Sequence, residues 1–505
     1  MDSSFAAWRK LIVGSDIRGC ETKLTDEFAE KIGYVFAQWT ARSFGLTSDQ
    51  ICLAVGHDPR ASGERLKRAL IAGMRAADCD VLDCGMCATS ALALACVEKP
   101  NGGRFARAHG AISVTAGHRP ADWNGFKFIT REGGISEADA EALVAAAATA
   151  ELPDPLVTEV DLQSEYADSL RSMVRRRLSD AGAKPLLGLH VIVDAGSGAG
   201  GFYAELLRGL GANTDGSRFL EPDGAFPNGV PDTEDERALE YIAKEVPARG
   251  ADLGVLIDAD GDRAAIVDQS GMRINGSRLI ALTASILLEE CPGATFVTDS
   301  VTSSGLQQFI NEWGGEHYRF KCGYRNVIGE AIRLNDEGVD CPLAIVTNGH
   351  AAFRENHFLD DGMYLATRLI CEAMRLKREG LTLSSRIADL HEPVERVQLR
   401  LPVLDEENVR SAAQDVIEAV LSHTLDDPEW VLAPDNREGV RITFNLDGGV
   451  CNAWFQLRIS MRDPVIPLDA ESDVPGGVKR ILTELYQLIR SADTLDLSAL
   501  REIIQ

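Results

Sequence analysis

Short apolar runs that end in Gly or Asp, each followed by a stretch of helical periodicity, recur along most of the chain. Examples are residues 51–56, 189–195 and 253–257. Strands that are buried on both faces of a parallel sheet produce such runs, and the helices that connect them produce the intervening period. The pattern therefore predicts an α/β fold built from strand–helix units.

The chain has 505 residues, which is more than one hydrophobic core supports, so several domains are expected. Three successive α/β units are followed, from residue 392, by alternating strands with two accompanying helices, which is typical of a smaller α+β domain. The predicted domains are 1–155, 156–270, 271–391 and 392–505.

The charge balance opposes binding to polyanions. There are 51 Lys and Arg residues against 77 Asp and Glu residues, which gives a net charge of −26. Such a chain repels nucleic acid and acidic membrane surfaces, so no nucleic-acid partner is expected. The basic run 175–177 lies in a charged helical stretch and is interpreted as a solvated helix face. A phosphorylated ligand would need a locally basic cleft.

The cysteines indicate reduced thiols. There are 11, an odd number, and no apolar signal core is evident near the N-terminus, so an intracellular protein is expected. Cys84 and Cys87 form one CxxC without a second pair at zinc-ligand spacing, which favours a buried structural pair. No run reaches the 18 or so apolar residues of a membrane span, so none is predicted.

Three carboxylates stand at alternate positions after a predicted strand. They are Asp258, Asp260 and Asp262 in the segment DADGDR. An extended backbone would point all three side chains the same way, and such oxygen ligands suit Mg²⁺. The spacing also resembles the start of an EF-hand loop, but the twelfth position is Gln269 instead of Glu. The alternative is a solvated acidic turn.

The glycine-rich segment 194–201 nearly matches a dinucleotide fingerprint. It begins an interior domain, however, whereas the fingerprint normally opens a first strand–helix unit. A tight structural turn is therefore favoured, and a nicotinamide-dependent oxidoreductase is the minor alternative.

Four segments carry a specific resemblance: GSDIRG at 14–19, VGHDPRASG at 55–63, VTAGHRPADWNGFKF at 114–128 and DADGDR at 258–263. Together they resemble the α-D-phosphohexomutases, which include phosphoglucomutase and phosphomannomutase. The resemblance implies a four-domain architecture, with three mixed α/β domains and a C-terminal α+β domain around a central cleft. It also implies carbohydrate metabolism and isomerase chemistry.

Further segments, at 217–232, 355–364 and 458–471, look most like the divergent phosphoglucomutase-like proteins of plants and algae. Many of those proteins are directed to plastids. The expected location is therefore the plastid stroma or the cytoplasm.

The resemblance implies a role for each matching residue. The three Asp residues of the DADGDR segment would hold Mg²⁺. Positive charge near a transferring phosphoryl group stabilises the charge that develops there. Arg18 and Lys127 would supply that charge, and His118 would act as an acid or base. The residues implied to bind substrate are Arg263, Lys321 and His350, with Arg458 and Ser460 anchoring the non-transferring phosphate. That anchor is partial, because Met461 and Arg462 stand where small polar residues are usual.

The active-site loop departs from the family pattern at its nucleophile. Family members read TASHNP, with the serine carried as phosphoserine, whereas residues 115–120 read TAGHRP. Gly117 has no hydroxyl, so it cannot hold a phosphoryl group. The phosphoserine also supplies one metal ligand in the family, and three carboxylates alone should bind Mg²⁺ less tightly.

The sugar-binding loop departs as well. The family usually has GEMSGH, and residues 345–350 read IVTNGH, so Val346 replaces the glutamate that would accept sugar hydroxyls. Buried hydroxyls left unpaired would cost about 1 to 3 kcal/mol each.

These losses favour a pseudoenzyme that binds a phosphorylated sugar or acts in an assembly with a protein partner. The alternative is an active mutase or phosphatase on an unusual phosphosugar, with Thr115 or His118 accepting the phosphate. Closure of the last domain onto the phosphate is the expected motion.

Overall fold

The computed structural model describes residues 3–97, 108–152, 158–404, 408–460 and 463–505. The chain divides into two compact units. Unit 1 comprises residues 1–275 and 348–386, and unit 2 comprises residues 276–347 and 387–505. The predicted break at 152–155 and the predicted departures at Met461 and Arg462 fall wholly or largely outside the described residues.

The first sheet of unit 1 is mixed, with strand order β1-β2-β6-β5-β3-β4-β8 and β7 paired to β6. Its short strands are β1 (Ile12–Val13), β7 (Gly133–Gly134) and β8 (Thr158–Glu159). Strands β3, β4 and β5 are parallel, whereas β6 runs antiparallel to both β5 and β2. The strands that matter here are β2 (Asp16–Cys20), β3 (Cys52–His57), β4 (Asp80–Met86), β5 (Gly110–Val114) and β6 (Trp123–Thr130). The main helices are α2 (Asp26–Ser43), α3 (Gly63–Ala76), α4 (Thr89–Ala95), α5 (Glu137–Ala147) and α6 (Leu162–Arg177).

Close helix packing explains part of the core of this first domain. Helix α2 begins after Thr25, whose side chain accepts a hydrogen bond from the Phe28 amide, and Asp26 and Glu27 lie in its first turn. It packs against α3, where a Cβ on Gly73 would lie 1.7 Å from the Glu30 carbonyl oxygen. Only glycine allows this approach of the two backbones. The apolar face thus buried belongs to a hydrophobic core cluster of unit 1.

The second sheet of unit 1 has the order β12-β11-β10-β9, in which β12 is the short strand Arg273–Ile274. Strand β9 (Val191–Asp194) is parallel to β10 (Leu253–Ile257), but β11 (Ala264–Asp268) returns antiparallel to β10 with Ile257 opposite Ala264. Strand β11 was not predicted from the strand–helix pattern, because a tight hairpin needs no crossover helix. The hairpin connection is residues 258–263, the predicted metal loop. Helices α7 (Phe202–Gly209), α8 (Glu236–Ala248) and α12 (Gly362–Arg378) also belong to unit 1.

Unit 2 contains three parallel strands and an antiparallel sheet. The parallel strands are β13 (Thr295–Asp299), flanked by β14 (Glu316–Phe320) and β15 (Leu343–Ile345), with helices α9 (Ser277–Glu290), α10 (Ser304–Glu312) and α11 (Tyr324–Asp336). The antiparallel sheet has the order β17-β21-β20-β19-β18. Its strands are β17 (Glu395–Pro402), β18 (Val431–Leu432), β19 (Val440–Phe444), β20 (Ala453–Leu457) and β21 (Val465–Ser472).

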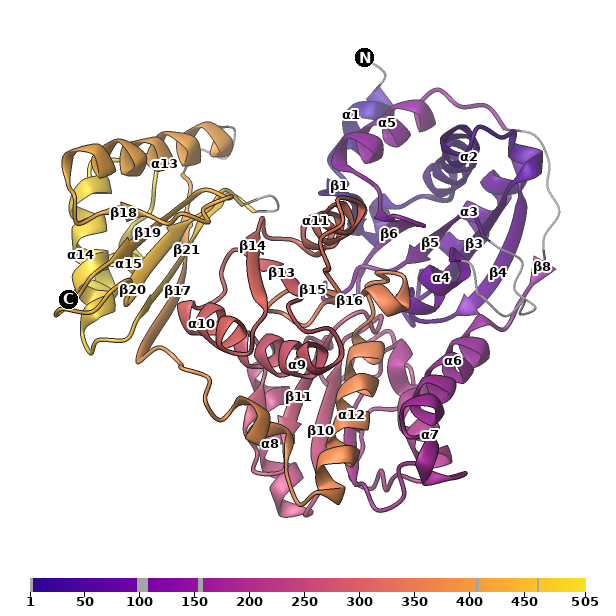
Figure 1. The fold of residues 1–505 in the computed structure, drawn as a ribbon. Coiled ribbons are helices and arrows are strands. Elements are labelled where there is room, and N and C mark those ends of the chain that lie inside the picture. Colours follow the sequence, from indigo (N-terminus) through magenta and orange to yellow (C-terminus); the bar gives the residue numbers. More distant parts are fainter. Residues whose placement is uncertain (1–2, 98–107, 153–157, 405–407, 461–462) are drawn as a thin grey trace. The chain divides into compact units, whose positions relative to one another are not determined.

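Helices α13 (Val409–Asp426), α14 (Gly477–Ile489) and α15 (Ser498–Ile504) pack on the antiparallel sheet and close its core (Figure 1). The architecture is thus α/β, with three mixed α/β domains and a C-terminal antiparallel-sheet domain, as predicted.

Three smaller expectations are also tested. Arg175 and Arg176 are exposed in the last turn of α6, which confirms the solvated helix face, and Arg177 pairs with Glu355 at 2.7 Å. Cys84 and Cys87 are buried free thiols, as are most of the 11 cysteines, all of which are free. Among the described helices, none combines the length and apolar character needed to cross a bilayer.

Candidate functional site

The metal loop gathers three carboxylates at one point. Asp258, Asp260 and Asp262 each offer an oxygen within 4.8 Å of the others, and all three residues are at most 3% exposed. The prediction that the alternate positions converge is confirmed. The alternative of a solvated acidic turn is wrong, because the β10–β11 hairpin folds back into the protein. Gly261 (φ +77°) provides the left-handed residue that this tight connection requires.

The pKa values of the buried carboxylates shift in different directions. Burial raises the pKa of Asp258 well above its usual value, and the neighbouring Asp262 and Asp260 add to this against the lowering effect of Arg263. Burial likewise raises the pKa of Asp260. Burial would raise the pKa of Asp262 too, but Lys127 and His350 outweigh it and hold that pKa below its usual value. Without a cation, the loop therefore accumulates unfavourable negative charge as the pH rises.

The donor set fits a hard divalent cation. One oxygen of Asp260 accepts a hydrogen bond from the Thr89 hydroxyl at 2.9 Å, whereas its other oxygen, Oδ1, is buried and has no hydrogen-bond partner among the described residues. An unpartnered buried carboxylate oxygen is costly, and Mg²⁺ prefers such oxygen ligands. The three Asp residues can therefore hold Mg²⁺.

Two cations border the carboxylates. Lys127, on β6, forms a buried ion pair with Asp262 and lies 3.7 Å from Asp360. Arg263 donates from Nε to Asp258 at 2.9 Å and from Nη1 to Asp232 at 3.0 Å, and its Nη2 is buried without a hydrogen-bond partner among the described residues. Arg263 thus has one donor left for a ligand.

His350 joins the same cluster from the segment that precedes α12. Its Nδ1 lies 2.9 Å from Asp360 Oδ2 and 3.6 Å from Asp262 Oδ1. Asp262, His350 and Asp360 also offer atoms within 4.8 Å of one another. Asp360 was not predicted as a site residue from the sequence, although the paired Asp residues at 360 and 361 directly before a helix were a usable signal.

The loop around Gly117 follows the C-terminal end of β5. Gly117 has φ +56°, and a Cβ built on it would lie 3.3 Å from Arg18 Nη1. Arg18 Nη1 also donates to the Ala116 carbonyl oxygen at 3.0 Å. Thr115 donates its hydroxyl to Asp58 at 2.8 Å and accepts from the Gly117 amide at 3.0 Å. Arg18 and Gly117 are therefore neighbours, and half-buried His118 follows directly in the chain.

Arg60 holds this loop in shape, a role that the sequence analysis missed. Its guanidinium is fully buried and pairs with Asp58 at 2.9 Å. The same group donates to four backbone carbonyl oxygens, those of Gly117, Arg119, Pro120 and Trp123. Arg60 is the arginine of the motif VGHDPRASG, so the motif itself was the available signal. The structure explains its role, because a buried arginine requires hydrogen-bond acceptors.

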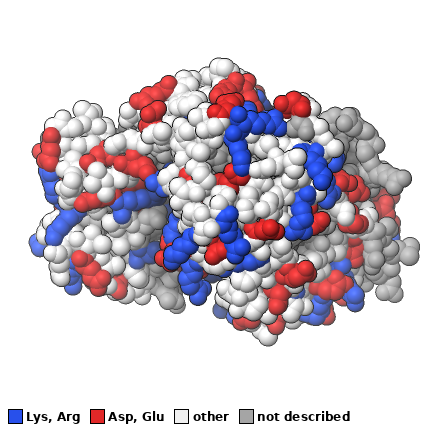
Figure 2. Space-filling view, turned by 90° about the horizontal axis from the view of Figure 1, so that it is seen from below, with Lys and Arg blue, Asp and Glu red and all other residues white. Residues whose placement is uncertain are grey.

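The Gly117 loop and the metal loop belong to one site. The Ser113 and Thr89 hydroxyls lie 2.8 Å apart, and Thr89 donates to Asp260. Ser113, two residues before Thr115, pairs across the sheet with Lys127, which contacts Asp262. Figure 2 shows basic and acidic side chains interspersed on one face of the molecule. Of the described residues at the metal loop, five carboxylates surround Lys127 and Arg263, namely Asp232, Asp258, Asp260, Asp262 and Asp360. The basic cleft expected for a phosphorylated ligand stays a prediction.

Comparison with known proteins decides the family. Three descriptions match: "Phosphoglucomutase/phosphomannomutase, alpha/beta/alpha domain I" over residues 9–153, domain II over 164–271 and domain III over 275–394. The phosphomannomutase of Salmonella typhimurium is 30% identical, over 94% of this chain and 97% of that protein. The chain belongs to the phosphoglucomutase/phosphomannomutase family.

Two other members extend the comparison. The phosphomannomutase/phosphoglucomutase of Pseudomonas aeruginosa is 28% identical over 91% of this chain and 92% of that protein. A solved structure of a family protein from Burkholderia thailandensis superposes with a TM-score of 0.78 at 28% identity, covering 96% of this chain and 98% of that one. These relatives are bacterial, so the resemblance to plant and algal proteins stays a prediction.

Family membership also bears on the glycine-rich segment. A Cβ on Gly198 would lie 2.7 Å from the Ala259 carbonyl oxygen, and one on Gly201 would lie 1.7 Å from that of Leu220. The Ala199 amide donates to the Ala259 carbonyl at 2.8 Å. The segment therefore packs against the metal loop of this phosphohexomutase-family protein, which supports the structural turn over a dinucleotide site.

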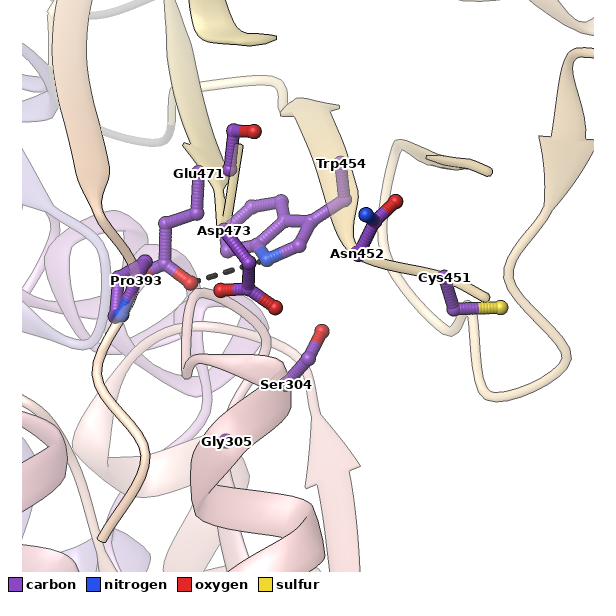
Figure 3. Close-up of a pocket in the computed structure, with 9 residues that line it drawn as sticks. Ser304, Gly305, Pro393, Cys451, Asn452, Trp454, Glu471 and Asp473 are labelled. Atoms are coloured by element: carbon purple, nitrogen blue, oxygen red, sulfur yellow. Dashed lines mark hydrogen bonds between the residues drawn. The ribbon is translucent and has the colours of Figure 1, made fainter. Parts of the chain in front are cut away.

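The remaining predicted residues of this family member lie in unit 2. Lys321 is exposed after β14. Arg458 Nη2 donates to Asp469 at 2.9 Å, and the Ser460 hydroxyl accepts from the Asp463 amide at 3.1 Å. A separate pocket of unit 2, which includes Ser304, Trp454 and Glu471, is lined by none of these predicted residues (Figure 3).

Proposed function

We propose that this phosphohexomutase-family protein binds Mg²⁺ and a phosphorylated sugar without forming a phosphoenzyme, and so acts as a pseudoenzyme. The observation that carries the proposal is Gly117. It stands at the position of the family nucleophile, in a loop that Arg60 still holds in shape and beside a metal loop whose three Asp residues are intact.

The neighbouring hydroxyl does not offer a ready substitute for serine. Thr115 is 1% exposed, donates to Asp58 and accepts from the Gly117 amide. Phosphorylating Thr115 would remove the hydrogen bond that its hydroxyl donates to Asp58 and would bury a dianion beside that carboxylate. These contacts argue against Thr115 as the phosphate acceptor.

The second candidate is an active mutase or phosphatase in which His118 accepts the phosphate. One observation favours it: Arg18, Lys127 and Arg263 remain around the loop together with the metal carboxylates. Such charges stabilise phosphoryl transfer. His118 is half-buried and follows Gly117 directly.

Each retained residue has a binding role under the proposal. Mg²⁺, when bound by Asp258, Asp260 and Asp262, would supply positive charge beside phosphoryl oxygens. Arg18 and the free Nη2 of Arg263 would orient those oxygens through charge-assisted hydrogen bonds. Lys127 would remain paired with Asp262 and keep that carboxylate ionised for the metal.

Two relatives of the same fold guide the choice of ligands. One solved structure is described as an N-acetylphosphoglucosamine mutase S69A variant with glucose 1,6-bisphosphate, and another as an N-acetylphosphoglucosamine mutase with GlcNAc-6P and magnesium. For this chain we favour a sugar bisphosphate, because a second phosphate could take the place that phosphoserine occupies in active members.

A mutase assay tests the proposal. Purified protein is assayed with Mg²⁺, glucose 1-phosphate or mannose 1-phosphate, and the matching 1,6-bisphosphate. The wild type and Gly117→Ala should be inactive, whereas Gly117→Ser should gain activity; Gly117→Ala has the same backbone cost without the hydroxyl. Turnover by the wild type at rates typical of mutases would refute the proposal and favour the second candidate.

The cellular setting is part of the proposal. We place the protein in the plastid stroma or the cytoplasm, where a pseudoenzyme could act on carbohydrate metabolism through a protein partner. Localisation of a tagged full-length chain tests the compartment.

A further inference from the structure

The loss of the sugar-loop glutamate raises the question of which group could receive sugar hydroxyls instead. Val346 directly follows β15 and is 4% exposed. Strand β15 pairs in parallel with β13, with Ile345 opposite Thr298. The residues that come next in the two segments, Val346 after β15 and Asp299 at the end of β13, are therefore neighbours. A carboxylate thus stands beside the position that lost one.

The side chain of Asp299 is only half engaged. Its Oδ2 accepts from the Thr347 amide at 3.2 Å and from the Thr347 hydroxyl at 2.8 Å. Asp299 is 6% exposed, and its Oδ1 is buried without a hydrogen-bond partner among the described residues. A buried carboxylate oxygen without a donor is costly, so the geometry leaves a place for a donor from a ligand.

A phosphate-binding candidate faces the same carboxylate. Arg458 is close enough to Asp299 to oppose the rise of its pKa. Arg458 pairs with Asp469 through Nη2, whereas its Nε is buried without a hydrogen-bond partner among the described residues. Both side chains belong to unit 2, and each has a buried polar atom, Asp299 Oδ1 and Arg458 Nε, without a hydrogen-bond partner among the described residues. A ligand with hydroxyl donors and a phosphate acceptor would satisfy both.

The position in the sheet is also appropriate. Asp299 ends β13, and Val346 directly follows the end of β15. Ligands of open α/β sheets bind beyond the carboxyl ends of parallel strands.

We propose that Asp299 is a specificity-determining residue that accepts the sugar hydroxyls in place of the glutamate missing at position 346. The ligand class is a hexose phosphate whose phosphate lies toward Arg458. This inference rests on the proposed function, because it presumes that the protein binds a phosphorylated sugar.

Binding measurements with a ligand series test it. The dissociation constants of glucose 6-phosphate, its monodeoxy analogues and inorganic phosphate are measured by calorimetry on the full chain. The variant is Asp299→Asn, which keeps the side-chain shape and can still accept from Thr347. The matched control is Asp493→Asn, an exposed Asp of unit 2. Melting temperatures of all three proteins establish folding.

The wild type should bind glucose 6-phosphate more tightly than inorganic phosphate and should discriminate against at least one monodeoxy analogue. Asp299→Asn should raise the dissociation constant of glucose 6-phosphate about 10- to 100-fold, since losing a hydrogen bond to a charged group changes affinity by about that factor. It should leave inorganic phosphate unchanged and should remove the discrimination against the deoxy analogue. Asp493→Asn should behave like the wild type.

A pH series adds an independent readout. Burial raises the pKa of Asp299 to about 6, against the lowering effects of Thr347 and Arg458, and Asp469 raises it further. The preference for glucose 6-phosphate over inorganic phosphate should therefore fall as the pH drops through about 6 in the wild type, and should not do so in Asp299→Asn.

The outcomes separate the two proposals. If the wild type binds hexose phosphates but Asp299→Asn changes nothing, or weakens inorganic phosphate equally, the role of Asp299 is overturned and phosphosugar binding stands. If the wild type binds neither hexose monophosphates nor bisphosphates, the proposed function fails and the inference fails with it.

Discussion

The metal loop and the Gly117 loop lie in one site of unit 1 but differ in what they retain. The metal loop keeps its three carboxylates, which are buried and converge on one point. The Gly117 loop keeps its scaffold, the buried Asp58–Arg60 pair and the Thr115 hydrogen bonds, but lacks the reactive hydroxyl. A loop with no remaining use would not need a buried arginine bound to four carbonyls. Under the proposed function, the shape and charge of the site serve binding of Mg²⁺ and a phosphorylated sugar, and the covalent step is lost.

The largest expected effect concerns that scaffold. Arg60→Met should lower the free energy of unfolding by about 3 to 5 kcal/mol, because it leaves the Asp58 carboxylate buried without its partner. Denaturant unfolding followed by circular dichroism measures the change. The control Arg65→Met removes an exposed ion pair with Asp26 and should cost less than about 1 kcal/mol. Equal effects of the two substitutions would show that the Gly117 loop is not held by Arg60.

The next effect concerns the metal loop. Asp260→Asn should weaken Mg²⁺ binding about 10- to 100-fold, since it removes the carboxylate with the unpartnered oxygen. The same variant should be more stable than the wild type in metal-free buffer at pH 8. The folded-state pKa of Asp260 is raised, so its contribution to stability is present below the usual Asp pKa and is lost as the pH rises through the folded value.

Calorimetric titration with Mg²⁺, together with melting temperatures from pH 4 to pH 8, measures both parts of this prediction. The exposed Asp49→Asn serves as the control. Unchanged Mg²⁺ affinity in Asp260→Asn would contradict the assignment of this loop as a metal-binding loop.

The smallest expected effect is that of restoring the side chain at position 117. Gly117→Ala and Gly117→Ser should each cost about 1 to 2 kcal/mol of stability, because an L-residue must adopt φ +56°. The Cβ contact with Arg18 at 3.3 Å is tight but lies at the end of a flexible side chain. The two variants should differ from each other by little in thermal unfolding. A much larger cost for either would mean that this loop tolerates only glycine.

Much of the fold follows from local patterns in the sequence. The apolar runs that became β3, β9, β10 and β13 are continuous and end in turn residues, so periodicity alone places them. Strand β14, with the sequence EHYRF, was missed because its side chains are mostly polar, and it is stabilised by pairing with β13. Strand β11 was also missed. Its direction is set by the tight connection at residues 258–263 and by its pairing with β10, and not by a local sequence pattern.

The candidate site could be predicted only in part. Regular alternation predicted the convergence of Asp258, Asp260 and Asp262. The role of Gly117 rests on the resemblance of the TAGHRP segment and stays a prediction. Arg60, Asp360 and Asp299 depend on contacts with residues far away in the sequence, such as Arg60 with Gly117 and Asp360 with Lys127. No local spacing rule reports such contacts. Their signal lies in burial, because a charged side chain inside the protein requires a partner.

The most direct test of the account is whether the protein itself becomes phosphorylated. Wild type, Gly117→Ala and Gly117→Ser are incubated with glucose 1,6-bisphosphate and Mg²⁺, and their intact masses are measured under neutral and acidic conditions. The account predicts a phosphoryl adduct on Gly117→Ser alone, stable to acid as a serine ester. A phosphoryl adduct on the wild type, whether on Thr115 or on His118, would contradict it.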